Sequence, residues 1–94
     1  MVFIINKLKY DTSKMVFITD KCEYSYKHAN IIGTLNCMGR NVKLYRSKKG
    51  NWLLTYETGY ENRGIALTEE EAEKMLLKYD YESYEKIFGE LEEA

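Results

Sequence analysis

The stretch that decides the fold is VKLYRSKKGNWLLTY, residues 42–56. Two runs that alternate apolar and polar residues flank Lys48-Lys49-Gly50, which is typical of a β-hairpin. We expect a type I turn followed by Gly50 with a positive φ, because glycine adopts that conformation at no steric cost. The resulting register predicts three pairs on one face: Arg46 with Trp52, Leu44 with Leu54 and Val42 with Tyr56.

The two faces of this predicted hairpin differ in chemistry. The face just described is apolar, apart from Arg46, which can make a cation–π contact with Trp52. The opposite face is a mixed surface that is free to meet solvent or a partner. It carries Lys43, Tyr45, Leu53 and Thr55.

Residues before 42 predict more strands. The β-branched run Val2–Ile5, followed by Asn6-Lys7, indicates a strand or a tight hairpin with residues 8–10. Residues 11–14 hydrogen-bond their own backbone readily, so we expect a turn or a single helical turn there, then a strand over residues 15–18.

The segment from residue 21 to 40 has a weaker pattern. Cys22, Tyr24 and Tyr26 alternate with polar residues, which favours a half-buried strand. Residues 31–39 are largely apolar with two glycines, which favours an irregular strand with a bulge.

Two helices are predicted after a loop over residues 58–64 and the lead-in residues 65–67. Thr68 and Glu71 form a capping box, so the first helix begins at Glu69. Its inward stripe is Ala72, Met75, Leu76 and Tyr79, and Glu70 can pair with Lys74 on the exposed side. Asp80 caps the second helix, which ends at Gly89. Its predicted inward residues are Tyr81, Tyr84, Ile87 and Phe88.

Together these patterns predict an α+β domain that spans residues 1–94. We expect an antiparallel sheet of about four or five strands within about residues 1–57, with two short C-terminal helices, about residues 68–89, packed on one face. The absence of proline, of internal repeats and of low-complexity linkers gives no reason to divide the chain.

Composition excludes several classes of protein. The chain has 94 residues, of which 45% are hydrophobic and 31% charged, which argues against disorder. Its longest apolar run, Met1–Ile5, is too short for a membrane span or a signal peptide, so we expect a cytoplasmic protein with no membrane partner.

Few residues are suited to metal or catalytic chemistry. Cys22, Cys37 and His28 supply at most three zinc ligands at unsuitable spacings, so no metal site, disulfide or cofactor is predicted. We expect both cysteines to be small apolar fillers on strands. His28 has no recognisable catalytic partner, so a binding protein is favoured over an enzyme, which would have to act through this histidine.

Charge is divided along the chain. Residues 1–63 hold 11 Lys and Arg against 5 Asp and Glu, a net charge of +6, whereas residues 64–94 hold 3 against 10, a net charge of −7. This division indicates either two poles that are open to a partner or acidic helices that neutralise a basic sheet.

Two groups of residues are candidates for partner binding. The first is basic and aromatic, a mixture suited to nucleic acid or to an anionic protein surface: Lys43, Tyr45, Arg46, Lys48, Lys49 and Trp52. The second is the acidic C-terminal part, represented by Glu70 and Glu73. The alternatives are ordinary exposed turn lysines, an indole in the core and solvated helix faces. Nine tyrosines also suit either a binding surface or a core.

Four segments carry a family resemblance: residues 9–12 (KYDT), 43–54 (KLYRSKKGNWLL), 66–72 (ALTEEEA) and 84–90 (YEKIFGE). In this order they resemble small proteins encoded by phages, plasmids and integrated elements of Firmicutes. Some neighbours of those proteins are inhibitors of host defence, including anti-CRISPR proteins. The chain departs from the group between Met15 and Arg40, where a glycine and aromatic linker is usual, which points to a specialised partner surface there.

The resemblance implies a non-enzymatic accessory protein of a mobile element that binds a host protein, such as a defence nuclease, and inhibits it. The alternative is a DNA- or RNA-binding accessory or regulatory protein that uses the basic hairpin. The sequence also leaves open whether exposed strand edges pair two copies into a homodimer.

Overall fold

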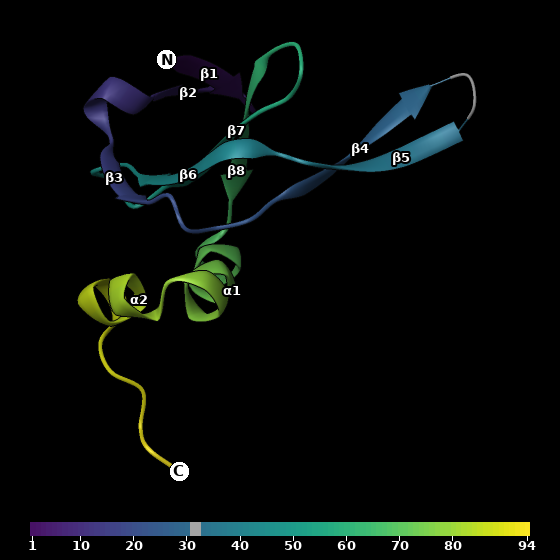
Figure 1. The fold of residues 1–94 in the computed structure, drawn as a ribbon. Helices are drawn as coiled ribbons and strands as arrows, with labels where there is room; N and C mark the ends of the chain where they lie inside the picture. Colours follow the sequence, from purple (N-terminus) through teal and green to yellow (C-terminus); the bar gives the residue numbers. More distant parts are fainter. Residues whose placement is uncertain (31–32) are drawn as a thin grey trace.

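The computed structural model describes residues 1–30 and 33–94, which form eight strands and two α-helices (Figure 1). The strands are β1 Val2–Ile5, β2 Leu8–Asp11, β3 Val16–Thr19, β4 Ser25–Asn30, β5 Gly33–Met38, β6 Arg40–Arg46, β7 Trp52–Glu57 and β8 Asn62–Leu67. The helices are α1 Glu69–Tyr79 and α2 Tyr81–Phe88. Every strand pair is antiparallel, so the predicted α+β class is confirmed.

The body of the molecule has three layers. A four-stranded sheet in the order β3-β6-β7-β8 forms the middle layer. The hairpin β1–β2 lies on one side of this sheet and the two helices lie on the other, as Figure 1 shows. We call these sides the hairpin side and the helix side. The third pair, β4–β5, projects sideways from the body, and we call it the arm.

The hairpin β6–β7 has the predicted turn. Gly50 has a φ of +88°, and its N–H donates to the carbonyl of Ser47 at 2.9 Å. Arg46 pairs with Trp52, and Leu44 pairs with Leu54, as expected. The third predicted pair, Val42 with Tyr56, is wrong because the register shifts between Arg40 and Lys43. Asn41, with a φ of +49°, lies at this irregularity.

The N-terminal elements also follow the sequence. Asn6 and Lys7 have φ angles of +51° and +64°, which are the angles of a two-residue turn between antiparallel strands. A single 3-10 turn, Thr12–Lys14, follows β2. It begins at Asp11, whose carboxylate accepts hydrogen bonds from the N–H and the hydroxyl of Ser13 at 3.1 and 2.7 Å.

Strand β7 is buried on both of its faces. Leu53 and Thr55 were predicted to lie on a mixed, open surface, but they are only 0% and 5% exposed. They point to the hairpin side, where β1–β2 covers this half of the sheet (Figure 1). The cover is close, because a Cβ added to Gly64 on β8 would lie 2.8 Å from Cγ of Phe3. The prediction of an open face was therefore wrong over β7.

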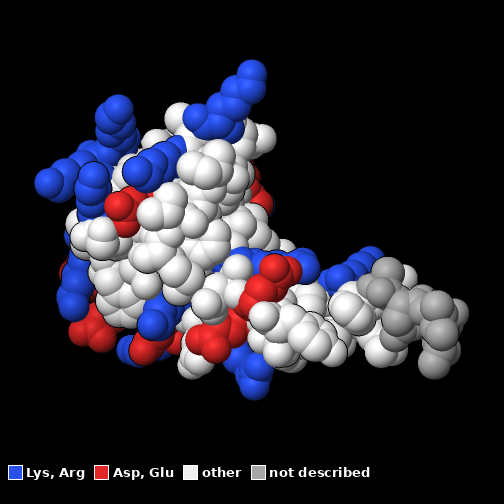
Figure 2. Space-filling model, turned by 90° about the horizontal axis from the view of Figure 1, so that it is seen from above, with Lys and Arg blue, Asp and Glu red and all other residues white. Residues whose placement is uncertain are grey.

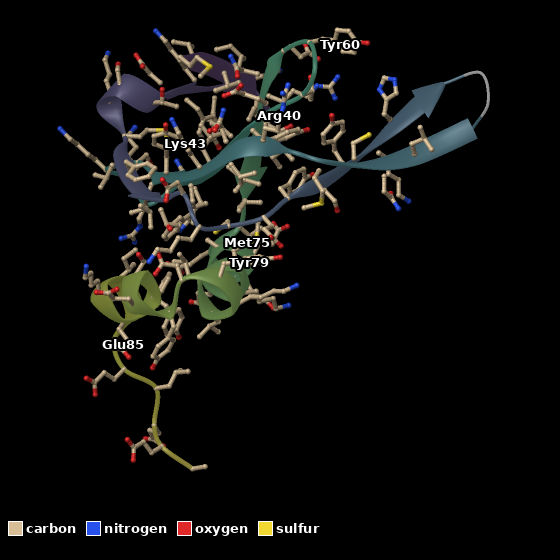
Figure 3. The ribbon with its side chains drawn as sticks, in the orientation of Figure 1. Arg40, Lys43, Tyr60, Met75, Tyr79 and Glu85 are labelled. Atoms are coloured by element: carbon tan, nitrogen blue, oxygen red, sulfur yellow. The ribbon has the colours of Figure 1, made fainter. Side chains whose placement is uncertain are left out.

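The main core lies between the helix side of the sheet and the two helices. Its buried side chains come from β6, β7, both helices and the segment before the arm: Cys22, Val42, Leu44, Trp52, Leu54, Tyr56, Ala72, Leu76 and Tyr84. Met75 and Tyr79 extend it, and Figure 3 shows both where α1 meets the sheet. The predicted inward stripe of α1 is thus confirmed.

The helix caps agree with the sequence. The hydroxyl of Thr68 accepts a hydrogen bond from the N–H of Glu71 at 3.1 Å, and the carboxylate of Glu71 accepts one from the N–H of Thr68 at 2.9 Å.

On α2, however, Tyr81 is 40% exposed, so its predicted inward position is wrong. It occupies the first turn, where its ring stacks at 5.9 Å on Tyr84 instead of entering the core.

Asp80 joins the two helices without an intervening loop. Its N–H donates to the carbonyl of Leu76 at the end of α1, and its carboxylate accepts from the N–H of Ser83 at 3.2 Å and from the hydroxyl of Ser83 at 2.7 Å. Burial raises the pKa of Asp80, but hydrogen bonds from Thr19 and Ser83 and the nearby Lys21 outweigh it. The net pKa is below its ordinary value.

Other boundaries differ from the sequence-based prediction. The predicted loop over residues 58–64 ends early, because β8 starts at Asn62 and also includes the expected helix lead-in. The carbonyl of Glu61 accepts a hydrogen bond from the N–H of Thr58 at 2.9 Å, which closes the turn and lets β8 pair with β7.

The arm is more regular than predicted. Its strands pair without a register shift from Ser25 with Met38 to Asn30 with Gly33, so the expected bulge does not occur within Gly33–Met38. Residues 31 and 32 lie outside the described residues.

Cys22 precedes β4, so its predicted place on a strand is wrong. The base of the arm packs through Tyr24 and Tyr26 on Tyr56, with ring centroids 4.9 and 5.4 Å apart.

We expect Gly64→Ala to lower the free energy of unfolding by about 1–3 kcal/mol, because the new methyl group overlaps the ring of Phe3. Replacing Phe3 by Leu in the same chain should recover part of the loss. Gly59→Ala is the control, since a Cβ there meets no atom within 4 Å. Urea unfolding measures all these variants. A Gly64→Ala variant as stable as Gly59→Ala would contradict the close cover of β8 by β1.

We expect Asp80→Ala to lower the free energy of unfolding at neutral pH by about 0.5–2 kcal/mol, the usual cost of losing a helix N-cap. Because the folded-state pKa is lowered, the contribution of this carboxylate is complete above its unfolded pKa of about 3.9. It disappears as the pH falls through the folded pKa. Unfolding measured against pH should therefore show the variant and the parent converging in acid. The exposed Asp20→Ala should show no such difference.

Candidate functional site

Four lysines from two separate hairpins surround one cleft. Lys9 and Lys14 come from β2 and the 3-10 turn, and Lys48 and Lys49 form the tip of the β6–β7 turn. The cleft between them measures about 330 Å³. We call it the lysine cleft.

The charge of the lysine cleft is strongly positive. Its only carboxylate among the lining residues is Asp11, so four ammonium groups against one carboxylate leave a net charge of +3. That carboxylate is already engaged by Ser13, whose hydrogen bonds, with its side-chain bond the largest cause, lower the pKa of Asp11. Asp11 therefore stays ionised and offsets one of the four lysines, which leaves the excess of three positive charges for a ligand.

The positive and negative halves of the chain are not joined by ion pairs. Among residues 1–30 and 33–94, the ion pairs are Arg63 with Glu61, Lys74 with Glu70 and Lys86 with Glu82. Each pair lies within one half, and none involves the lysine cleft. Figure 2, which looks down on the hairpin side, shows Lys and Arg side chains standing out from the end of the body opposite the arm. Mutual neutralisation of the two halves by salt bridges is therefore wrong for the described residues.

The predicted basic and aromatic group is divided between the two faces of the sheet. Arg46 and Trp52 lie on the helix side, where the guanidinium is 5.3 Å from the centre of the indole ring. Trp52 is 1% exposed and lies 6.0 Å from the ring of Phe88, so it belongs to the core and cannot contact a partner. Its assignment as a binding residue was wrong. The Nε of Arg46 is likewise buried.

Lys43 and Tyr45 lie on the hairpin side of β6. Figure 3 shows Lys43 on this side, and Tyr45 follows two residues later on the same strand, so both side chains share a face. Lys43 is exposed and Tyr45 is half-buried. These two residues and the tip lysines therefore remain candidates for partner contact. No local sequence pattern indicated Lys9 and Lys14, because the packing of β1–β2 brings them to the cleft from a distant part of the chain.

The acidic candidates lie on the outer surface of the helices. Glu70 is well exposed and forms the predicted pair with Lys74 at 3.3 Å. Glu73 is half-buried. Figure 3 shows Glu85 on the side of α2 away from the sheet, so carboxylates from both helices border solvent there.

His28 lines a second hollow, of about 380 Å³, between the arm and the β7–β8 turn. Lys27, Cys37 and Tyr60 line it too. Cys37 pairs with Tyr26 in the arm, which places it diagonally from His28 on the same face. Glu61 and Arg63 line the hollow as well, and among the described residues no hydrogen bond or ion pair reaches the imidazole.

The two cysteines lie in different environments. Burial, with a smaller effect of Asp80, raises the pKa of the Cys22 thiol to about 11, which suits an unreactive core residue. Cys37 is partly exposed on β5. Within the described part of the chain, no cluster of three or more His, Cys, Asp or Glu side chains is arranged to hold a metal ion.

Comparison with known protein families, with curated proteins and with solved structures found no match for this chain. None of its described helices has the length and apolar character needed to cross a lipid bilayer.

Proposed function

We propose that this chain is a non-enzymatic protein that binds nucleic acid through the lysine cleft. The observation that supports this proposal is the convergence of four lysines, from two hairpins, on one cleft with no ion pair among the described residues. Lysine ammonium groups neutralise backbone phosphates and release condensed counterions, which drives binding to any sequence. It corresponds to the alternative function that the basic hairpin indicates in the sequence.

The position of the tip lysines favours a long polyanion over a small anion. Lys48 and Lys49 line the lysine cleft and also a hollow of about 460 Å³ on the other side of the turn, beside β3 and α2. A ligand that follows the turn from one hollow to the other can contact several phosphates in succession. A single phosphate group would engage only part of this surface.

We expect the double variant Lys48→Glu and Lys49→Glu to bind fluorescein-labelled nucleic acid much more weakly than the parent. The slope of log K against log salt should fall by about 2 units, because each phosphate contact contributes about 1 unit. Fluorescence anisotropy at several salt concentrations measures both quantities.

The double variant Lys78→Glu and Lys86→Glu is the control, because it changes the net charge equally but lies on the helices. It should retain the salt slope of the parent. A parent protein with no salt-dependent binding, or an equal loss in both double variants, would refute the role of the lysine cleft.

A second function is favoured by the acidic helices. Their exposed carboxylates lie across the molecule from the hairpin side, and only Glu70 and Glu82 are paired with lysines among the described residues. We propose for this surface a protein partner with a basic groove, such as a host defence nuclease, as the resemblance to mobile-element proteins implies. Carboxylates placed where phosphates would lie can occupy such a groove.

We expect the chain to co-elute on a sizing column with an RNA-guided nuclease of its host, and the double variant Glu70→Lys and Glu73→Lys to elute separately. The pair Asp20→Lys and Glu61→Lys changes the charge equally outside the helices and should still co-elute. Separate elution of the parent from every such nuclease tested would reject this second function.

A further inference from the structure

One half of the hairpin side of the sheet is only partly covered. The hairpin β1–β2 covers β7 and β8, as the contact of Phe3 with Gly64 and the burial of Leu53 show. Strands β3 and β6 form the other half, and their side chains on this face include Phe17, Lys43 and Tyr45. Phe17 is 50% exposed, which is unusual for a phenylalanine with a core nearby.

Phe17 and Tyr45 form an aromatic pair on this partly covered half. They are paired across β3 and β6, and their ring centroids are 5.8 Å apart with planes inclined at 70°. This edge-to-face arrangement holds the two rings against each other while leaving part of the Phe17 surface free. We call Phe17 and Tyr45 the aromatic pair.

Each member of the aromatic pair has a lysine close to it in the sequence. Lys43 lies two residues before Tyr45 on β6, and Lys14 lies three residues before Phe17. Lys14 and Met15 line the lysine cleft, so the cleft reaches the start of β3, the strand that carries Phe17. An apolar ring surface and a set of phosphate-binding ammonium groups therefore lie next to each other.

We propose that the nucleic acid is single-stranded and that its bases stack on the aromatic pair while its phosphates contact the lysine cleft and Lys43. This proposal rests on the proposed nucleic-acid function and specifies its ligand. A duplex hides the faces of its bases and leaves only phosphates and groove edges to contact, so it cannot use Phe17 and Tyr45 in this way. An unpaired strand offers both bases and phosphates.

A protein partner fits this face less well. The charge around this face is positive on balance, since Lys43 lies on it and the adjoining lysine cleft has four lysines against one carboxylate, Asp11. An apolar protein surface would leave these ammonium groups without a negative partner. In a single strand, each nucleotide offers a phosphate for the ammonium groups and a base for the aromatic rings.

The test compares an oligothymidylate of about ten nucleotides, within the usual site size of single-strand binders, with a duplex of the same length by fluorescence anisotropy. We expect the parent to bind the single strand more tightly. Phe17→Leu and Tyr45→Leu should each weaken it by roughly 5- to 150-fold, the range for losing one stacked base. Neither should change the salt slope, because no phosphate contact is lost.

Tyr60→Leu is the matched control. Tyr60 is 93% exposed at the β7–β8 turn, where Figure 3 shows it at the edge of the molecule, and it lines the hollow beside the arm. Its loss should leave single-strand affinity unchanged. Thermal unfolding of each variant separates a loss of binding from a loss of folding.

A second measurement uses the unmodified protein. An oligonucleotide that carries 5-iodouracil is cross-linked by light, and the attached peptides are identified by mass spectrometry. Cross-links to Phe17 or Tyr45 would support the proposal. Equal affinity for single strand and duplex, with cross-links only elsewhere, would overturn it while leaving the lysine cleft as a nucleic-acid site. Absence of binding to either nucleic acid would overturn the proposed function as well.

Discussion

The burial of β7 on both faces is the constraint on which the rest of the structure depends. Five consecutive residues from Trp52 are buried, so a single covering layer is not enough. The helices bury Trp52, Leu54 and Tyr56 on one side, and the N-terminal hairpin covers Leu53 and Thr55 on the other. That hairpin has strands of only four residues, and it covers β7 more fully than β3 and β6, where Phe17 is 50% exposed and Tyr45 is half-buried. This uneven cover leaves room for the lysine cleft and leaves half of the Phe17 surface exposed.

Local signals in the sequence predicted most of the elements but not their layers. The β6–β7 turn, the capping box at Thr68 and the cap at Asp80 depend on residues within a few positions of one another, and all were confirmed. The cover over Leu53 comes from a segment some forty residues earlier, and no local pattern reports it. The loop predicted over residues 58–64 is too long for a related reason. Residues 62–64 favour a loop by themselves, but pairing with β7 makes them part of β8.

The candidate site was predicted in part for the same reasons. Lys48 and Lys49 lie at the turn that the sequence defines, and the sequence placed them correctly among exposed residues. Trp52 was misassigned because alternation tells which residues share a face, but not which face the helices cover. Lys9 and Lys14 have no local signal beyond a charged strand end, so only the packing of β1–β2 on the sheet shows that they share a cleft with the tip lysines.

The position of Asp80 bears on how the chain folds during synthesis. This residue ends α1, begins α2 and accepts a hydrogen bond from Thr19 at the end of β3, the edge strand of the sheet. The helix side of β7 therefore stays uncovered until both helices, which follow the last strand, have left the ribosome. A nascent chain that has emerged only as far as β8 has a complete sheet with one apolar face exposed to water. Exposed apolar surface of this kind is prone to association with other chains until the helices cover it.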